Sequence, residues 1–227
     1  YDNLRTYGGH SWDFEGVAQQ LWRVIKPGGV VVWVVADATI DGSETGTSFR
    51  QALRFMEIGF RLHDTMIYEC TGTGAKGSVK AYWQAFEYMF VLARESPKSV
   101  NLLRDKRNAN AGKVIVPNDG PRSTKGFRTV GEFGIRENIW RVKSANQFNG
   151  TDHPAPFPEA LARDHILSWS NDGDIVLDPF NGSGTTTKMA RLMGRRFIGI
   201  DVNEDYCEIA RKRLAQKLLD FGEVTDG

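Results

Sequence analysis

A strand, a glycine-rich loop, a helix, a second strand and an acidic residue follow one another between positions 174 and 201. The run from Asp174 to Leu177 predicts a short strand that ends at Asp178, and Arg196 to Ile200 predicts another that ends at Asp201. A helical pattern over 185–193 connects them. This is a βαβ unit, the half-module of a doubly wound parallel sheet, which binds ligands at the carboxyl ends of its strands.

The loop from Asp178 to Thr187 favours a nucleotide-like ligand. Gly182 and Gly184 let backbone amides approach a ligand closely, and the helix after them begins with free N–H groups. Asp201 comes nineteen residues after Gly182, close to the spacing at which an acid reaches ribose hydroxyls. A tight turn without a ligand is the alternative for a lone Gly-x-Gly, but the strand before it and the acid after it favour the ligand.

A dinucleotide such as NAD is the competing ligand. Thr187 stands where the third glycine of a dinucleotide motif would be, and the pair Asp178-Pro179 precedes the loop. A carboxylate stabilises a positively charged sulfonium better than it stabilises phosphates. Adenosine joined to an amino acid therefore fits better, and an NAD-binding oxidoreductase stays as an alternative.

Residues 1–93 show a second set of alternating elements, which we expect to share one domain with residues 150–227. Helical spacing, β-branched runs and the breaker Lys26-Pro-Gly-Gly29 predict helices over 12–25 and 48–58, and strands over 30–35, 61–69 and 87–93. The last two strands are expected to form a hairpin. A further helix is predicted over 158–169, before the βαβ unit.

Residues 94–149 between these parts are loop-rich and basic. Five glycines and three prolines interrupt short apolar runs at 114–116 and 139–142. From Arg94 to Lys143, twelve Lys and Arg face five Asp and Glu, a local charge of +7 in a chain of net charge +1. This asymmetry fits either an insertion that faces a polyanion or a solvated surface loop.

The sequence shows no features of a membrane protein, a secreted disulfide-rich protein or a zinc protein. The longest apolar run, Gly29 to Ala36, is too short to span a bilayer, and the start has no signal-peptide pattern. Cys70 and Cys207 have neither disulfide-framework nor zinc spacing, and the histidines are scattered. We therefore expect a cytoplasmic protein with two reduced thiols and no metal.

Three stretches resemble bacterial and phage DNA amino-methyltransferases. Asp178-Pro-Phe-Asn-Gly-Ser-Gly-Thr-Thr resembles their cofactor motif, and His153-Pro-Ala-Pro-Phe-Pro-Glu159 resembles the segment that closes over the methionine end of the cofactor. Lys26-Pro-Gly-Gly with the strand after it is also similar, although it is widespread among methyltransferases. The resemblance implies S-adenosylmethionine as cofactor and a Rossmann-like methyltransferase sheet. It also implies site-specific methylation of adenine N6 or cytosine N4 in double-stranded DNA.

The resemblance assigns cofactor contacts to two groups of residues. In the βαβ unit they are Asp178, Pro179, Phe180, Gly182, Ser183, Gly184, Thr185 and Asp201, and before it they are His153, Pro154, Ala155 and Phe157.

The order of the motifs resembles the permuted, beta-class subgroup. There a catalytic tetrad of Asp, Asn or Ser followed by Pro-Pro-Tyr comes before the cofactor loop. Tyr1 and the residues after it are similar to the family's tetrad tyrosine and the stretch beyond it. Tyr1 is therefore expected to stack on the extruded base, and the chain to lack its N-terminal part. A frayed terminal aromatic is the alternative for Tyr1. The target base depends on the first tetrad residue and stays open.

The basic insertion resembles a target-recognition segment. Candidates for phosphate or base contacts are Arg104, Lys106, Arg107, Lys113, Arg122, Lys125 and Arg128. Trp83 is a candidate for base stacking, and Asp37 either faces the active site or is a turn residue. An RNA or protein-glutamine methyltransferase, and an inactive DNA- or cofactor-binding module, are the alternative functions. A homodimer, a restriction partner and the recognition sequence are left open.

Overall fold

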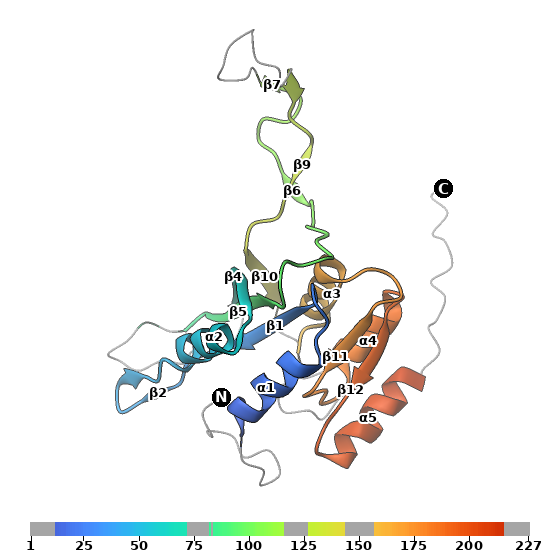
Figure 1. The fold of residues 1–227 in the computed structure, drawn as a ribbon. Helices are drawn as coiled ribbons and strands as arrows, with labels where there is room; N and C mark the ends of the chain where they lie inside the picture. Colours follow the sequence, from blue (N-terminus) through green and yellow to red (C-terminus); the bar gives the residue numbers. More distant parts are fainter. Residues whose placement is uncertain (1–11, 72–81, 83, 116–126, 144–156, 216–227) are drawn as a thin grey trace.

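A four-stranded sheet lies at the centre of the molecule (Figure 1). The computed structural model describes residues 12–71, 82, 84–115, 127–143 and 157–215. The strand order is β1-β5-β4-β10, with bounds β1 (Val30–Val35), β5 (Phe86–Ala93), β4 (Arg61–Thr71) and β10 (Ile139–Lys143). β5 pairs antiparallel with both β1 and β4, and β10 pairs parallel with β4. The predicted hairpin of β4 and β5 is confirmed.

The βαβ unit is present as predicted, beside this sheet. β11 (Ile175–Asp178) pairs in parallel with β12 (Arg196–Gly199), and α4 (Thr185–Leu192) connects them. α5 (Glu204–Ala215) comes after β12 and packs on α4 (Figure 1). The α/β, Rossmann-like class is confirmed. A mostly parallel sheet was expected, but two of the three strand pairings in the central sheet are antiparallel.

Two amphipathic helices cover one part of the central sheet. α1 (Phe14–Val24) begins where the Asp13 side chain accepts a hydrogen bond of 2.9 Å from the Gly16 amide, and α2 (Thr47–Ile58) ends at Gly59, whose φ is 127°. Their apolar stripes join β1 and β5 in one core cluster around the fully buried Phe55. Between β1 and α2 lies a small hairpin of β2 (Thr39–Ile40) and β3 (Ser43–Glu44).

α3 (Glu159–Trp169) joins the central sheet to the βαβ unit. Its Leu161 is fully buried in a cluster with β4, β5 and β10, while Ala162 and Ile166 pack against Met189 and Ala190 of α4. One helix therefore packs against both the central sheet and the βαβ unit, and its first residue, Glu159, pairs with Lys188 of α4.

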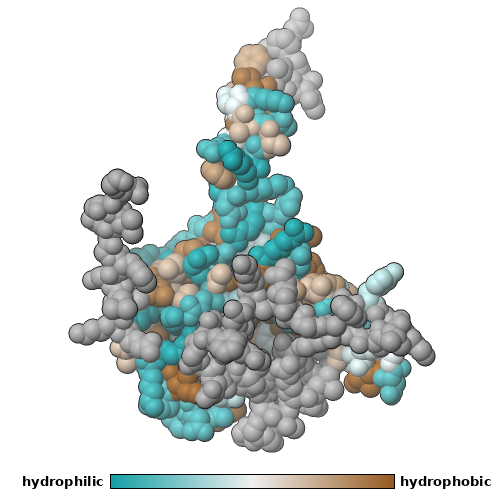
Figure 2. Space-filling view, turned by 180° about the vertical axis from the view of Figure 1, so that it is seen from behind, coloured by the Kyte–Doolittle hydropathy of each residue, from teal (hydrophilic) through white to brown (hydrophobic). Residues whose placement is uncertain are grey.

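A two-stranded ribbon, which we call the arm (residues 104–115 and 127–137), stands off this body (Figure 1). β6 (Lys106–Arg107) pairs with β9 (Phe133–Gly134), and further out β7 (Val114–Ile115) pairs with β8 (Arg128–Thr129). Figure 2 shows a mostly hydrophilic stem with hydrophobic side chains nearer its far end.

The chain returns from the arm into the central sheet. The interrupted apolar pattern predicted an irregular segment over 139–142, but this run forms β10, where Trp140 is buried and pairs with Tyr68 of β4. The reason is non-local: a five-residue strand takes its stability from a partner about seventy residues away.

No helix in the described ranges is long and apolar enough to cross a membrane.

Candidate functional site

Two carboxylates mark the carboxyl ends of neighbouring parallel strands. Asp178 is the last residue of β11, in register with Gly199 of β12, and Asp201 lies two residues beyond that glycine. The Asp178 carboxylate accepts a hydrogen bond of 3.0 Å from the Phe180 amide. Burial raises the pKa of Asp178, and the charge of Asp201 acts in the same direction. A cationic ligand at this edge would offset both effects.

Asp201 organises the glycine loop. One carboxylate oxygen accepts a hydrogen bond of 2.8 Å from the Gly182 amide, and the other accepts one of 2.9 Å from the Asn203 amide. Gly182 has a positive φ of 49°. The loop after β11 is thereby tied to the end of β12, so that the acid and the glycines form one structural unit.

Gly184 lets α5 approach the start of α4. It caps that helix in the left-handed conformation at φ 82°, and a Cβ on it would lie 2.8 Å from the Cβ of Ala210. No residue with a side chain fits there without displacement of α5. Asn181 closes the turn, since its amide donates to the Ile200 carbonyl at 2.9 Å and its side-chain oxygen accepts from Thr187 at 2.9 Å.

Arg213 of α5 supports the loop from behind, a role that the sequence analysis missed. Its guanidinium donates to the Ser183 carbonyl at 2.7 Å and hydroxyl at 3.0 Å, and to Glu159 of α3 at 2.9 Å. Lys188 of α4 also pairs with Glu159, at 2.7 Å. Arg213 lies one helical turn after Ala210, which contacts Gly184. The three-residue spacing between Ala210 and Arg213 was the only indication in the sequence that Arg213 faces the loop. On a helix rich in charged residues, Arg213 resembles an ordinary surface cation.

An aromatic group borders Asp178. Phe180 is 47% exposed, and its ring centroid lies 5.0 Å from that of Trp12 and 6.5 Å from that of Trp33. Trp12 Nε1 is buried and has no hydrogen-bond partner among the described residues. An exposed ring and two carboxylates together suit a ligand with a flat base, hydroxyl groups and a positive charge. S-adenosylmethionine has these three features, so the residues fit it.

The structure brings most of the predicted cofactor residues together. Those of the βαβ unit other than Asp201 follow one another from the last residue of β11 to the first residue of α4, and Ser183 and Thr185 among them are buried. Asp201 lies beyond β12 and joins them through its hydrogen bond with Gly182. The residues of the first group are Asp178, Pro179, Phe180, Gly182, Ser183, Gly184 and Thr185. Phe157 instead packs, partly buried, between the clusters that α3 joins. His153, Pro154, Ala155 and the predicted catalytic Tyr1 lie outside the described residues.

Asp37 has a structural role at the start of α2. Its carboxylate accepts a hydrogen bond of 2.9 Å from the Ser48 amide and further hydrogen bonds from the Ser48 and Thr45 hydroxyls. Of the two alternatives raised for Asp37, these contacts match the turn residue.

The predicted DNA contacts that are described all lie on the arm. They are Arg104, Lys106, Arg107, Lys113 and Arg128, whereas Arg122, Lys125 and Trp83 lie outside the described residues. Lys106 pairs with Glu137, and Arg107 lies 3.9 Å from Glu132.

Arg136, at the root of the arm, is a further structural residue that no local pattern in the sequence indicates. It pairs with Asp105 and, at 2.6 Å, with the buried Asp164 of α3, and its guanidinium lies over the Trp140 ring. Arg136 holds the pKa of Asp105 below its usual range through its hydrogen bonds to that carboxylate. This contact fixes the arm to the helix that begins beside the cofactor loop.

No group of His, Cys, Asp and Glu suited to a metal ion occurs in the described parts of the chain.

Comparison with known proteins identifies the family of this chain. A family model described as DNA methylase matches residues 1–212. The orphan methyltransferase M.BamHII of Bacillus amyloliquefaciens is 51% identical over an alignment of 231 residues, and the alignment covers 96% of this chain and 87% of that protein.

Solved structures share the fold. M1.HpyAVI in its complex with SAM has a TM-score of 0.61 at 24% identity, covering 88% of this chain and 80% of that one. The cytosine-N4-specific PvuII DNA methyltransferase has a TM-score of 0.63 at 17% identity, covering 95% of this chain and 76% of that one. Because the family model spans nearly the whole chain and includes the cofactor loop, this chain belongs to the DNA methylase family.

Proposed function

We propose that this DNA methylase transfers the methyl group of S-adenosylmethionine to an exocyclic amino group, adenine N6 or cytosine N4, at specific sites in double-stranded DNA. The observation that carries the proposal is the linkage of Asp178, Gly182 and Asp201 at the ends of two parallel strands, within a chain that matches the family over 1–212. A Rossmann-like sheet alone would support many reactions, so the linked residues are the decisive feature.

The cofactor supplies a methyl group on a positively charged sulfur. Asp178, ionised beside that charge, stabilises its binding, and the low polarity that raises the pKa of Asp178 strengthens the attraction. Asp201 accepts hydroxyl hydrogens while it holds Gly182 in place. Phe180 offers its exposed ring for packing on the adenine.

The arm supplies contacts to the nucleic acid. It projects from the body, carries the basic residues and enters the chain between the first set of elements and the cofactor loop (Figure 1). This order supports the permuted arrangement of motifs, and we propose Tyr1 as the residue that stacks on the flipped base. A projecting basic arm favours a duplex over a protein glutamine as substrate. We place the reaction in the bacterial cytoplasm, where the relatives' host DNA lies.

Two measurements test the proposal. Calorimetry is expected to show micromolar binding of S-adenosylmethionine and none of NAD; the reverse would contradict the cofactor assignment. Sequencing of modified bases in DNA from cells that express the protein is expected to show methylated adenine or cytosine at one short sequence. Methyl transfer to RNA or to protein, with unmodified DNA, would contradict the substrate.

A further inference from the structure

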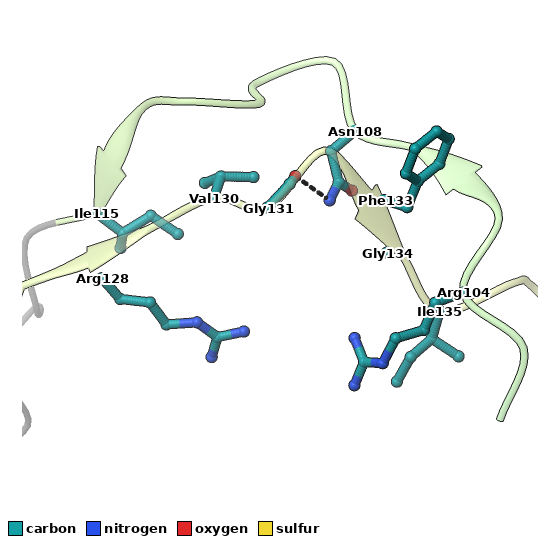
Figure 3. A pocket seen from close by; sticks show the side chains of 9 residues that line it. All are labelled: Arg104, Asn108, Ile115, Arg128, Val130, Gly131, Phe133, Gly134 and Ile135. Carbon is teal, nitrogen blue, oxygen red and sulfur yellow. Dashed lines mark hydrogen bonds between the residues drawn. The ribbon is translucent and has the colours of Figure 1, made fainter. Parts of the chain in front are cut away.

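Two arginines of the arm face each other across a hollow (Figure 3). Arg104 comes from the segment just before β6 and Arg128 from β8, and their guanidinium groups point toward one another. The hollow has a volume of about 420 Å³. Its other lining residues are Asn108, Ile115, Val130, Gly131, Phe133, Gly134 and Ile135.

Backbone pairing holds the hollow in shape. Asn108 donates from its side chain to the Gly131 carbonyl at 2.8 Å and from its amide to the Glu132 carbonyl at 2.8 Å. A Cβ on Gly134 would lie 2.8 Å from the Asn108 side-chain oxygen, so the two strands approach closely here. The arginines therefore project from a ribbon whose geometry exists before any ligand binds.

These two arginines differ in their surroundings from three of the arm's four other described basic residues, while the fourth, Lys113, bonds to the Asn110 side chain and not to a carboxylate. Lys106, Arg107 and Arg136 each pair with a carboxylate, on Glu137, Glu132 and Asp105 respectively. Within the described residues, neither Arg104 nor Arg128 forms an ion pair, so two unneutralised cations remain on one face. Such a pair attracts an anion or a group rich in oxygen acceptors.

The walls between the arginines are apolar and solvent-accessible. Ile115, Phe133 and Ile135 are 52%, 48% and 45% exposed. A duplex presents phosphate and guanine acceptors next to deoxyribose carbons and thymine methyl groups, which matches cations next to aliphatic surface. The major groove also admits a two-stranded ribbon.

We propose that this hollow is the surface with which the arm holds duplex DNA, with Arg104 and Arg128 donating hydrogen bonds to oxygen or nitrogen acceptors of one duplex. The inference rests on the proposed function and goes further, because it selects two residues and one face of the arm. The acceptors are either phosphate oxygens or the O6 and N7 atoms of a guanine.

The test uses the variants Arg104→Gln and Arg128→Gln. Binding is measured by fluorescence anisotropy on a duplex of about 30 base pairs, long enough to span a specific site. One duplex carries the sequence found methylated in cells and the other is scrambled, and both are titrated across a salt series. Each variant is expected to lower affinity for the methylated-site duplex about tenfold. Where the contact is to phosphate, both duplexes lose affinity and the slope of log K against log salt falls by about 1. Where the contact is to guanine, only the site duplex loses affinity.

Arg23→Gln is the matched control, since it removes the same charge from the exposed end of α1, where the Arg23 side chain donates to Gln20. Its DNA affinity is expected to equal that of the wild type. S-adenosylmethionine affinity and the circular dichroism spectrum are expected to be unchanged in all three variants. Unchanged DNA affinity in both arm variants, with a wild type that methylates DNA, would overturn the inference while leaving the proposed function intact. A wild type that binds the duplex but methylates no base would instead contradict the proposed function.

Discussion

The Asp201 carboxylate accepts a hydrogen bond of 2.8 Å from the Gly182 amide, across nineteen residues and an entire helix. This hydrogen bond links Asp201, which follows β12, to the glycine loop that follows β11. A substitution at Asp201 therefore removes both the contact that we propose for the cofactor and a hydrogen bond that holds the loop.

We expect Asp201→Ala to weaken S-adenosylmethionine binding more than about tenfold, because it removes the acceptor for both the Gly182 and Asn203 amides. Asp201→Asn keeps one acceptor oxygen, so its loss should be intermediate. Calorimetry measures both, and circular dichroism checks that the fold is retained. Wild-type affinity in both Asp201→Ala and Asp178→Ala would be incompatible with the site.

Arg213 should position the loop without touching the ligand. Arg213→Ala is expected to raise the Kd of S-adenosylmethionine several-fold while DNA affinity stays the same, because it removes the bonds to Ser183 and Glu159. Arg213→Lys should restore only part of the affinity, because it keeps the positive charge but a lysine ammonium cannot bridge both Ser183 and Glu159. Arg211→Ala, on the exposed side of the same helix, is the control. Equal effects of the two alanine variants would argue against positioning.

Gly184→Ala should destabilise the protein more than Gly173→Ala. Both glycines have positive φ, 82° and 76°, so both variants incur about 1–2 kcal/mol of backbone strain. Only at Gly184 does the added Cβ meet another residue, Ala210 at 2.8 Å, which adds about 1–3 kcal/mol. Urea unfolding measures the difference. Equal midpoints would show that α5 does not pack this closely.

His165 makes stability depend on pH. It is buried, its ring stacks on Trp140 at 4.5 Å, and Nε2 lies 3.1 Å from the Met89 sulfur. Burial lowers its pKa from 6.5 to about 4, and Arg136 acts in the same direction against the charge of Asp164. As the pH falls below 6.5, His165 becomes protonated in the unfolded chain, whereas in the folded protein it stays neutral until about pH 4.

The free energy of unfolding should therefore be lower at pH 4 than at neutral pH, with His165 contributing up to about 3 kcal/mol of the difference. His165→Phe keeps an aromatic ring and removes the titration. Its free energy of unfolding, measured in urea from about pH 7.5 to about pH 4, should fall less steeply than that of the wild type. Parallel curves would contradict the assignment to His165.

Local patterns in the sequence were enough to identify most regular elements. The spacing of apolar residues placed α1, α2 and α3 within one or two residues, because each helix buries one face and its stripe repeats along the chain. Gly59 ended α2 as expected, and the strand, loop and acid around Gly182 were placed in the right order. In each case the information lies within a few residues of the feature that it specifies.

Tertiary structure alone decided which charges are neutralised and which strands pair. β10 joined the central sheet through β4, Arg213 became a support for the loop through Gly184 and Ala210, and Arg136 was paired with Asp164 of α3. These contacts join positions about thirty to seventy residues apart, and no local period encodes such a distance. The sequence by itself therefore determined the glycine loop and the resemblance to the family, while packing brought Arg213 against that loop and left Arg104 and Arg128 without a carboxylate partner among the described residues.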